Sequence, residues 1–140
     1  MLARFELQGR IVYLIKPLTY MNVSGPMLSQ LARRLGFAAG QCVLVHDDID
    51  LPLGAVRVRM KGGDGGHRGV GSIQRAFGSD AFRRVKIGVG RPEQPGHAAH
   101  HVLTSFATTQ MPVIERACTE AARRVQELLD LSAPTSKDTQ

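Results

Sequence analysis

The sequence predicts an α/β fold, a single layered domain with a mixed, largely parallel sheet flanked by helices. Three observations predict it. Short apolar runs typical of strands alternate with longer segments whose apolar residues recur at helical spacing. Their order (strand–helix–strand, a strand pair, then helix–strand–helix) is typical of a layered α/β domain. The 140 residues, 43% of them apolar, suffice for one core, because a domain of this size buries roughly 68–70% of its unfolded surface.

Four segments are predicted as strands. Residues 11–15 and 42–45 are continuous apolar runs, which indicates buried strands. Residues 55–60 alternate in character, with valines on one face and arginines on the other. This strand is therefore expected to be half exposed, with a basic outer face. Residues 85–89 form another alternating strand.

Three segments are predicted as helices. The first begins at Ser24, which is expected to be the N-cap, and stops at Gly36. A short helix that includes residues 73–77 follows a glycine-rich turn. The last and longest helix runs from about residue 112 to residue 129 and carries an apolar stripe at helical spacing.

The chain is predicted to be one cytoplasmic domain. Residues 1–131 form that domain, and the polar residues 132–140 form a disordered tail. Every apolar run is far shorter than the ~20 residues that a membrane span needs. Glu6 and Gln8 interrupt any apolar core of a signal peptide. The two cysteines lack the Cys and His spacing of a zinc site.

The charge of the chain favours a polyanionic partner. Its net charge is +6 and its pI is near 10.0, a surplus that promotes contacts with phosphates. Charge spread evenly for solubility is the alternative, and composition does not decide between the two. Aromatic residues make up 5%, so platforms on which single-stranded bases could stack are scarce. Most of the paired arginines are interpreted as solvated charges.

The segment His46–Asp50 (HDDID) is the first candidate site. Its three carboxylates follow a predicted buried strand, and the C-terminal ends of such strands carry the ligand sites of open α/β sheets. One carboxylate could orient a histidine base or bind Mg²⁺. A solvated acidic turn is the alternative. Since acidic residues are unexpected against a polyanion, an RNA partner would favour a catalytic role for one of them.

The glycine-rich stretch Gly62–Gly71 is the second candidate. Its N–H groups could bind a phosphate. His67 and Arg68 add a titratable group and a fork of phosphate-matching donors on the same loop. The stretch matches neither a P-loop nor a GxGxxG motif, so a nucleotide cofactor is not expected.

Other polar residues give weaker signals. Asn22 could hold a carbonyl or a water molecule, and a turn-forming role is the alternative. Arg59 and Lys86, on different predicted strands, could jointly bind a phosphate. The three histidines between residues 97 and 101 have no carboxylate or cysteine among them, so no metal site is expected there.

Four of these motifs occur in a fixed order along the chain. They are Lys16–Gly25 (KPLTYMNVSG), His46–Gly54 (HDDIDLPLG), Gly62–Gly69 (GGDGGHRG) and Phe82–Pro92 (FRRVKIGVGRP). In sequence and spacing they resemble the bacterial-type peptidyl-tRNA hydrolases. The resemblance continues through the segment 101–106 into the last helix and covers essentially the whole chain.

The resemblance implies an esterase that recycles tRNA from stalled translation. The family cleaves the ester between a peptide and the 3′-terminal ribose of tRNA, with no metal and no organic cofactor. A histidine general base activates water, and an aspartate orients the histidine. Asp47 matches that aspartate. Asn22 and Tyr20 match residues at the scissile end of the substrate. Arg59 and Lys86 fall where the family binds tRNA phosphate.

The sequence departs from the family pattern in two places. The opening block, a Gly-Asn-Pro-Gly turn and a Thr-Arg-His-Asn segment, is not in this sequence. The catalytic histidine is therefore assigned to no residue, and the chain is expected to be impaired in activity. Arg68 stands where many members have asparagine, which suggests a phosphate or oxyanion contact. Arg68 and the neighbouring His67 are both expected to bind the substrate.

Two other functions remain open at this point. One is a non-catalytic RNA-binding relative of the same fold. The other is an unrelated doubly wound domain that binds a small anion at its glycine loop. The enzyme is the leading hypothesis, with the acceptor end of peptidyl-tRNA as its partner, no metal, no membrane contact and a monomeric state.

Overall fold

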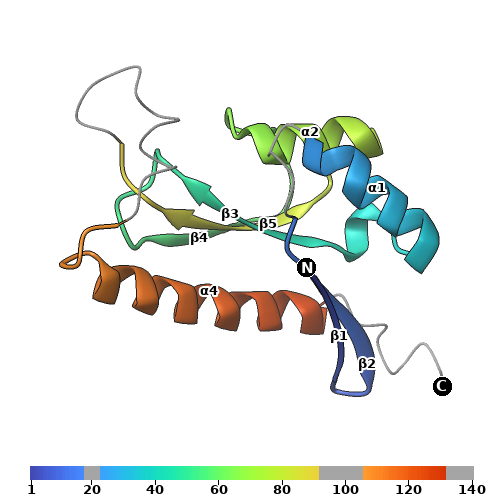
Figure 1. Ribbon diagram of the computed structural model, residues 1–140, viewed down its shortest axis with the longest axis horizontal. Coiled ribbons are helices and arrows are strands. Elements are labelled where there is room, and N and C mark those ends of the chain that lie inside the picture. Colours follow the sequence, from blue (N-terminus) through green and yellow to red (C-terminus); the bar gives the residue numbers. More distant parts are fainter. Residues whose placement is uncertain (18–22, 92–105, 132–140) are drawn as a thin grey trace. The chain divides into compact units, whose positions relative to one another are not determined.

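A computed structural model describes residues 1–17, 23–91 and 106–131. The elements in these ranges are β1 Leu2–Leu7, β2 Arg10–Ile15, α1 Ser24–Leu35, the 3₁₀ turn η2 Ala39–Gln41, β3 Val43–Asp48, β4 Val56–Arg59, α2 Arg68–Phe77, β5 Arg83–Gly88 and α4 Met111–Leu131 (Figure 1). Every strand and helix that the sequence predicts is present, to within about two residues in most cases. None of the described helices is long and apolar enough to cross a membrane.

The chain divides into two compact units. One consists of residues 1–36 and 64–78, and the other of residues 37–63 and 79–140. The assignment of residues 1–131 to a single domain, followed by a tail, stays a prediction.

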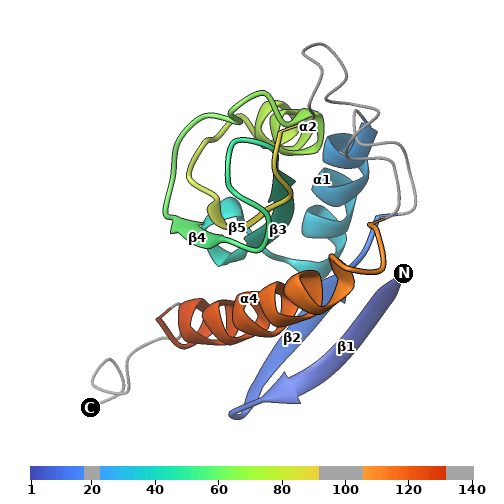
Figure 2. The same cartoon turned by 90° about the vertical axis from the view of Figure 1, so that its left-hand side faces the viewer.

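The sheet of the second unit has the order β3–β5–β4. β3 runs parallel to β5, and β4 runs antiparallel to it, so the predicted mixed sheet is confirmed. Helix α4 lies along one face (Figures 1 and 2). The core between them consists of Val43, Val56, Val58, Val85, Ile87, Ala121, Val125 and Leu128. The valines of β4 thus point to the core and its arginines to the other face, as their alternation predicts.

The central strand β5 begins with two buried arginines. Arg83 is 8% exposed and Arg84 is 1% exposed, so this pair is an exception to the interpretation of most arginine pairs as solvated charges. Arg83 donates hydrogen bonds to the carbonyls of Leu128, at 2.8 Å, and Gly40, at 3.0 Å. The Leu128 carbonyl belongs to the last turn of α4, where carbonyls lack helical partners. Arg83 therefore stabilises the end of α4 against the sheet.

The first unit contains the packed helices α1 and α2. Gly25 allows their close approach, because a Cβ atom on it would lie 2.0 Å from the carbonyl oxygen of Ser72. The Gly25 N–H also donates to the Ser72 hydroxyl at 2.9 Å. Helix α1 ends at Gly36 in the left-handed conformation, as predicted. Its N-cap, however, is Val23, and Ser24 is the first helical residue.

Strands β1 and β2 form an antiparallel hairpin. The sequence predicts β2 but not β1. The two residues of the turn, Gln8 and Gly9, both have positive φ angles, of 52° and 77°, as a type I′ hairpin turn requires. The prediction that β2 is buried is wrong, because Ile11 is 51% and Leu14 is 54% exposed.

Candidate functional site

The carboxylates of Asp48, at the end of β3, and of Asp50 are held by cations and by the backbone. The Asp48 carboxylate lies 3.1 Å from the Lys86 ammonium, and these side chains are only 16% and 19% exposed. Asp48 also accepts a hydrogen bond from the Asp50 N–H at 2.7 Å. Asp50 in turn forms an exposed ion pair with Arg91. Asp48 and Asp50 are therefore part of an ordered, charge-compensated turn.

Asp48 is ionised at neutral pH. Its partial burial raises its pKa, but the Asp50 N–H, the Lys86 ammonium and the nearby His46 together lower it, and the net pKa lies below the ordinary value. Sequence reasoning missed the pairing of Asp48 with Lys86. The signal would have been the parallel register of β3 and β5, which places His46 beside Lys86.

Asp47 lies on the other face of β3. The register pairs Asp47 with Ile87 and His46 with Lys86, and successive side chains of a strand point to opposite faces. The Asp47 side chain is half-buried. The ring Nδ1 of His46 lies 2.8 Å from the Asp47 carbonyl oxygen, so this nitrogen is assigned as the protonated donor. The side chain of Asp47, the predicted catalytic aspartate, therefore points to the face of the sheet opposite the Asp48–Lys86 pair.

The face of the sheet away from α4 is basic. The pairing of Arg57 with Lys86 and of Arg59 with Arg84 places all four side chains on this face. Arg57 and Arg59 are exposed. Arg59 and Lys86 are diagonal neighbours on adjacent strands. Because the charge of Lys86 is compensated by Asp48, the exposed arginines are the stronger attractors for an anion on this face.

Some backbone N–H groups of the glycine-rich loop already donate hydrogen bonds within the loop. The Asp64 carboxylate accepts from the Gly66 N–H at 2.8 Å, and the Asp64 carbonyl accepts from the His67 N–H at 3.0 Å. A Cβ atom on Gly71 would lie 2.5 Å from the Asp64 carboxylate, so this carboxylate packs against the first turn of α2. A negative charge there is stabilised by the helix dipole, and the loop is a less open phosphate site than the sequence suggests.

His67 is the N-cap of α2. Its ring Nδ1 accepts a hydrogen bond from the Val70 N–H at 3.2 Å, so Nε2 is assigned as the protonated nitrogen. Arg68, the first residue of α2, is exposed. Sequence reasoning placed both residues on one loop but did not foresee the capping role of His67.

Several predicted residues lie outside the described ranges. Tyr20 and Asn22 are among them, as are the histidines of residues 97–101. Within the part of the chain that the structure describes, no group of three or more His, Cys, Asp or Glu side chains could hold a metal ion.

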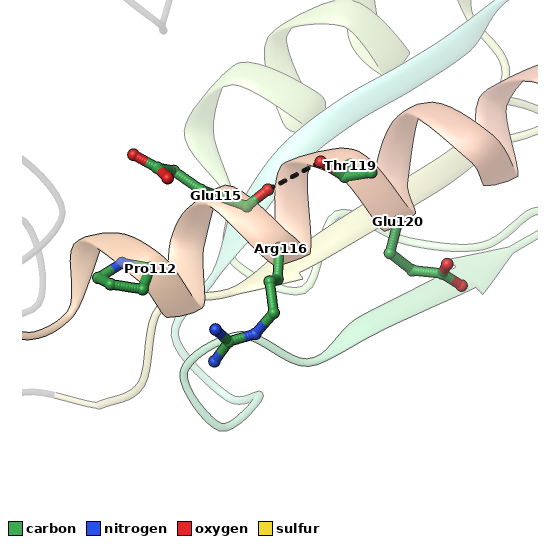
Figure 3. A pocket seen from close by; sticks show the side chains of 5 residues that line it. All are labelled: Pro112, Glu115, Arg116, Thr119 and Glu120. Carbon is green, nitrogen blue, oxygen red and sulfur yellow. Dashed lines mark hydrogen bonds between the residues drawn. The ribbon is translucent and has the colours of Figure 1, made fainter.

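A shallow surface depression lies on α4, lined by Pro112, Glu115, Arg116, Thr119 and Glu120 (Figure 3). All five residues belong to one helix, and none of the predicted site residues is among them. Their contacts are local, such as the hydrogen bond from the Thr119 hydroxyl to the Glu115 carbonyl, at 3.1 Å. A ligand here would meet one wall, which is unlike the concave sites that bury most of a small molecule.

Comparisons with known proteins agree on one family. A sequence model of the family described as peptidyl-tRNA hydrolase matches residues 1–139. The chain is 39% identical over 126 residues to a peptidyl-tRNA hydrolase of Mycobacterium avium, covering 90% of the chain and 66% of that protein. It is 40% identical over 124 residues to one of Aquifex aeolicus, covering 89% and 65%.

A solved structure is similar as well. The crystal structure of peptidyl-tRNA hydrolase from Acinetobacter baumannii superposes with a TM-score of 0.83 at 29% identity, covering 91% of this chain and 64% of that one. The chain spans 61% to 70% of the length of the curated relatives it matches.

Proposed function

The chain belongs to the peptidyl-tRNA hydrolase family, and from that premise we propose that it acts on peptidyl-tRNA, cleaving the ester between the peptide and the terminal ribose. The observation that carries the proposal is the family match over residues 1–139. A basic sheet face that carries the exposed Arg57 and Arg59, and the half-buried Asp47 on the other face, support it. An unrelated anion-binding domain is excluded by the family membership.

In this proposal Asp47 orients a histidine general base, which activates the attacking water. The proposal assigns that base to none of the five histidines of the chain. Asn22 and Tyr20 hold the scissile end of the substrate, because an amide can both donate to and accept from an ester and a water.

Phosphate contacts are proposed for the basic residues. Arg59 is the principal contact because it is exposed on the basic face. Lys86 contributes less, since Asp48 neutralises it. His67 and the exposed Arg68 contact the substrate from the start of α2. We further propose a monomer that binds the acceptor end of peptidyl-tRNA in the cytoplasm, without a metal.

A salt series tests the phosphate contact. Arg59→Ala should weaken tRNA binding and reduce the slope of log K against log salt by about one unit, the effect of one lost phosphate contact. Arg116→Ala is the matched control, because it removes an exposed arginine from α4, on the opposite face of the sheet. Equal slopes for parent and Arg59→Ala would exclude the contact, and absence of tRNA binding by the parent would overturn the proposed function.

A chemical-rescue assay tests Asp47. Release of the peptide from an N-acetyl-aminoacyl-tRNA is measured with added imidazole, which supplies a general base from solution. The rate should rise with imidazole in the parent and far less in Asp47→Asn, while both proteins bind tRNA equally. The same imidazole series without protein gives the background. If Asp47→Asn instead weakens binding and leaves the rate of bound substrate unchanged, Asp47 is a binding residue.

A further inference from the structure

The guanidinium of Arg59 rests on a specific piece of backbone. Its Nε–H donates to the Lys61 carbonyl at 3.0 Å. Directly beside it lies Gly62, where a Cβ atom would be 2.6 to 3.0 Å from the guanidinium atoms. Any side chain at Gly62 would push Arg59 aside. Arg59 is therefore an exposed arginine with a fixed seat, which consists of the Lys61 carbonyl and the bare Cα of Gly62.

The peptide that forms this seat is held at both ends. The Gly62 N–H donates to the Asp80 carbonyl at 3.0 Å. On the other side of the peptide, the Lys61 carbonyl receives Arg59 and a long, weak contact from Arg84 at 3.5 Å. A peptide fixed through both its N–H and its C=O has little rotational freedom, so its carbonyl is a stable acceptor.

Arg84 fixes the backbone that follows. Its guanidinium donates to the Gly63 carbonyl at 2.6 Å and to the Gly62 carbonyl at 3.2 Å. With 1% of its surface exposed, Arg84 cannot itself contact a large ligand. Glycine-rich backbone is flexible, and a forked donor that spans consecutive carbonyls removes that freedom where Arg59 needs its support.

We infer that Arg84 is a positioning residue for phosphate recognition: it fixes the Lys61–Gly63 backbone, and this backbone orients Arg59. The inference rests on the proposed function for its link to tRNA. The orientation of a forked guanidinium matters because it matches a phosphate through two parallel hydrogen bonds. A fixed seat also lowers the conformational entropy that Arg59 loses on binding.

The first test observes the seat without any ligand. The Arg59 Nε–H resonance of the ¹⁵N-labelled chain is identified by its disappearance in Arg59→Ala, and its exchange with water is measured. Arg84→Lys keeps the charge but loses the fork, so this exchange should accelerate. Arg83→Lys is the matched control, since Arg83 is also buried but bonds to Leu128 and Gly40, and it should leave the Arg59 signal unchanged.

The second test couples the seat to tRNA binding. One phosphate contact contributes about fivefold in affinity at 0.15 M salt, from a slope of roughly 0.9 per contact. Arg84→Lys should lose about two- to fivefold, and adding it to Arg59→Ala should lose nothing further. Gly62→Ala places a Cβ atom against the Arg59 guanidinium and also strains the backbone of the seat, because Gly62 has a φ of 120°. It therefore disturbs the seat without changing Arg84, and keeps the design informative if Arg84→Lys does not fold.

The outcomes separate the two hypotheses. If the parent does not bind tRNA, the proposed function fails, while the exchange of the Arg59 Nε–H still decides whether Arg84 holds the seat. An unchanged Arg59 signal in both Arg84→Lys and Gly62→Ala would overturn the positioning role. Additive losses of tRNA affinity in the double variant would overturn it as well, because independent residues add.

Discussion

Strands β2 and β5 differ in burial in the opposite sense to what their sequences suggest: the apolar strand β2 is the more exposed, and the basic strand β5 is the more buried. β2, RIVYLI, is almost entirely apolar, but each of its residues is exposed or half-exposed. β5, RRVKIG, contains three cations, and four of its six residues are buried. The difference is one of position. β5 is the centre of its sheet and has a partner on each side, whereas within the described residues β2 pairs only with β1. Strand burial thus follows topology more closely than hydrophobicity.

The cations of β5 can be buried, or half-buried in the case of Lys86, because each has a partner. Arg83 reaches the end of α4, Arg84 reaches the carbonyls of Gly62 and Gly63, and Lys86 reaches Asp48. A buried charge without such partners would be costly. Two of these cations also belong to the proposed phosphate site, since Arg84 supports the seat of Arg59 and Lys86 lies on the basic face.

The largest expected effect comes from the start of the central strand. Phe82 precedes β5 and is 0% exposed, so Phe82→Ala should lower the free energy of unfolding by about 3–5 kcal/mol, through lost burial and the cavity left behind. Urea unfolding followed by circular dichroism measures it. Phe82→Leu fills most of the volume and should cost clearly less. A loss for Phe82→Ala under about 1 kcal/mol would contradict the burial of this position.

Much of the fold could be predicted because local patterns decide it. The left-handed end of α1 at Gly36 follows from glycine's tolerance of positive φ. The inward valines and outward arginines of β4 follow from the two-residue period of a strand. The hairpin was missed because its turn begins with Gln8 at φ 52°, a conformation that non-glycine residues rarely adopt.

The contacts of the site depend on distant residues. Arg84 bonds to carbonyls 21 and 22 residues away in the sequence, and Lys86 meets Asp48 through the parallel register. No periodicity encodes these pairings. A usable signal was nevertheless present for one of the two adjacent arginines that lead into the alternating strand of residues 85–89. One of them must point to the face that carries Val85 and find acceptors there, and this is Arg83, which bonds to the Leu128 carbonyl. No such signal marks Arg84, which lies on the other face.

A smaller effect is expected at the ion pair between Asp48 of β3 and Lys86 of β5. Asp48→Asn should cost about 1.5–3 kcal/mol at pH 7, the usual contribution of a charge-assisted hydrogen bond. Since the pKa of Asp48 is lowered in the folded chain, its contribution is present above the ordinary carboxyl pKa of about 3.9 and is lost as the pH falls through the folded value. The gap between parent and variant should therefore close below about pH 4.

Urea midpoints at pH 7, 5, 4 and 3 test this prediction. Asp50→Asn is the matched control, because its ion pair with Arg91 is exposed and exposed pairs contribute little. The difference between parent and Asp48→Asn isolates one carboxylate from the titration of the others. A gap that stays constant from pH 7 to pH 3 would mean that the Asp48–Lys86 pair does not stabilise the fold.

The smallest effect is expected in the hairpin, and it bears most directly on the contrast with β5. Phe5 of β1 faces Val12 of β2 and is 45% exposed. Phe5→Ala should therefore cost about 1 kcal/mol or less, from partial burial and the cross-strand pair of an aromatic with a valine side chain. The measurement is the urea unfolding used for Phe82→Ala, so that the same substitution is compared at two phenylalanines. Its control is Glu6→Ala, an exposed position of the same strand, where a near-neutral result is expected. A loss of 3 kcal/mol or more at Phe5 would show that the apolar side chains of the hairpin are as buried in solution as those of β5, and the contrast between the two strands would then be one of sequence alone.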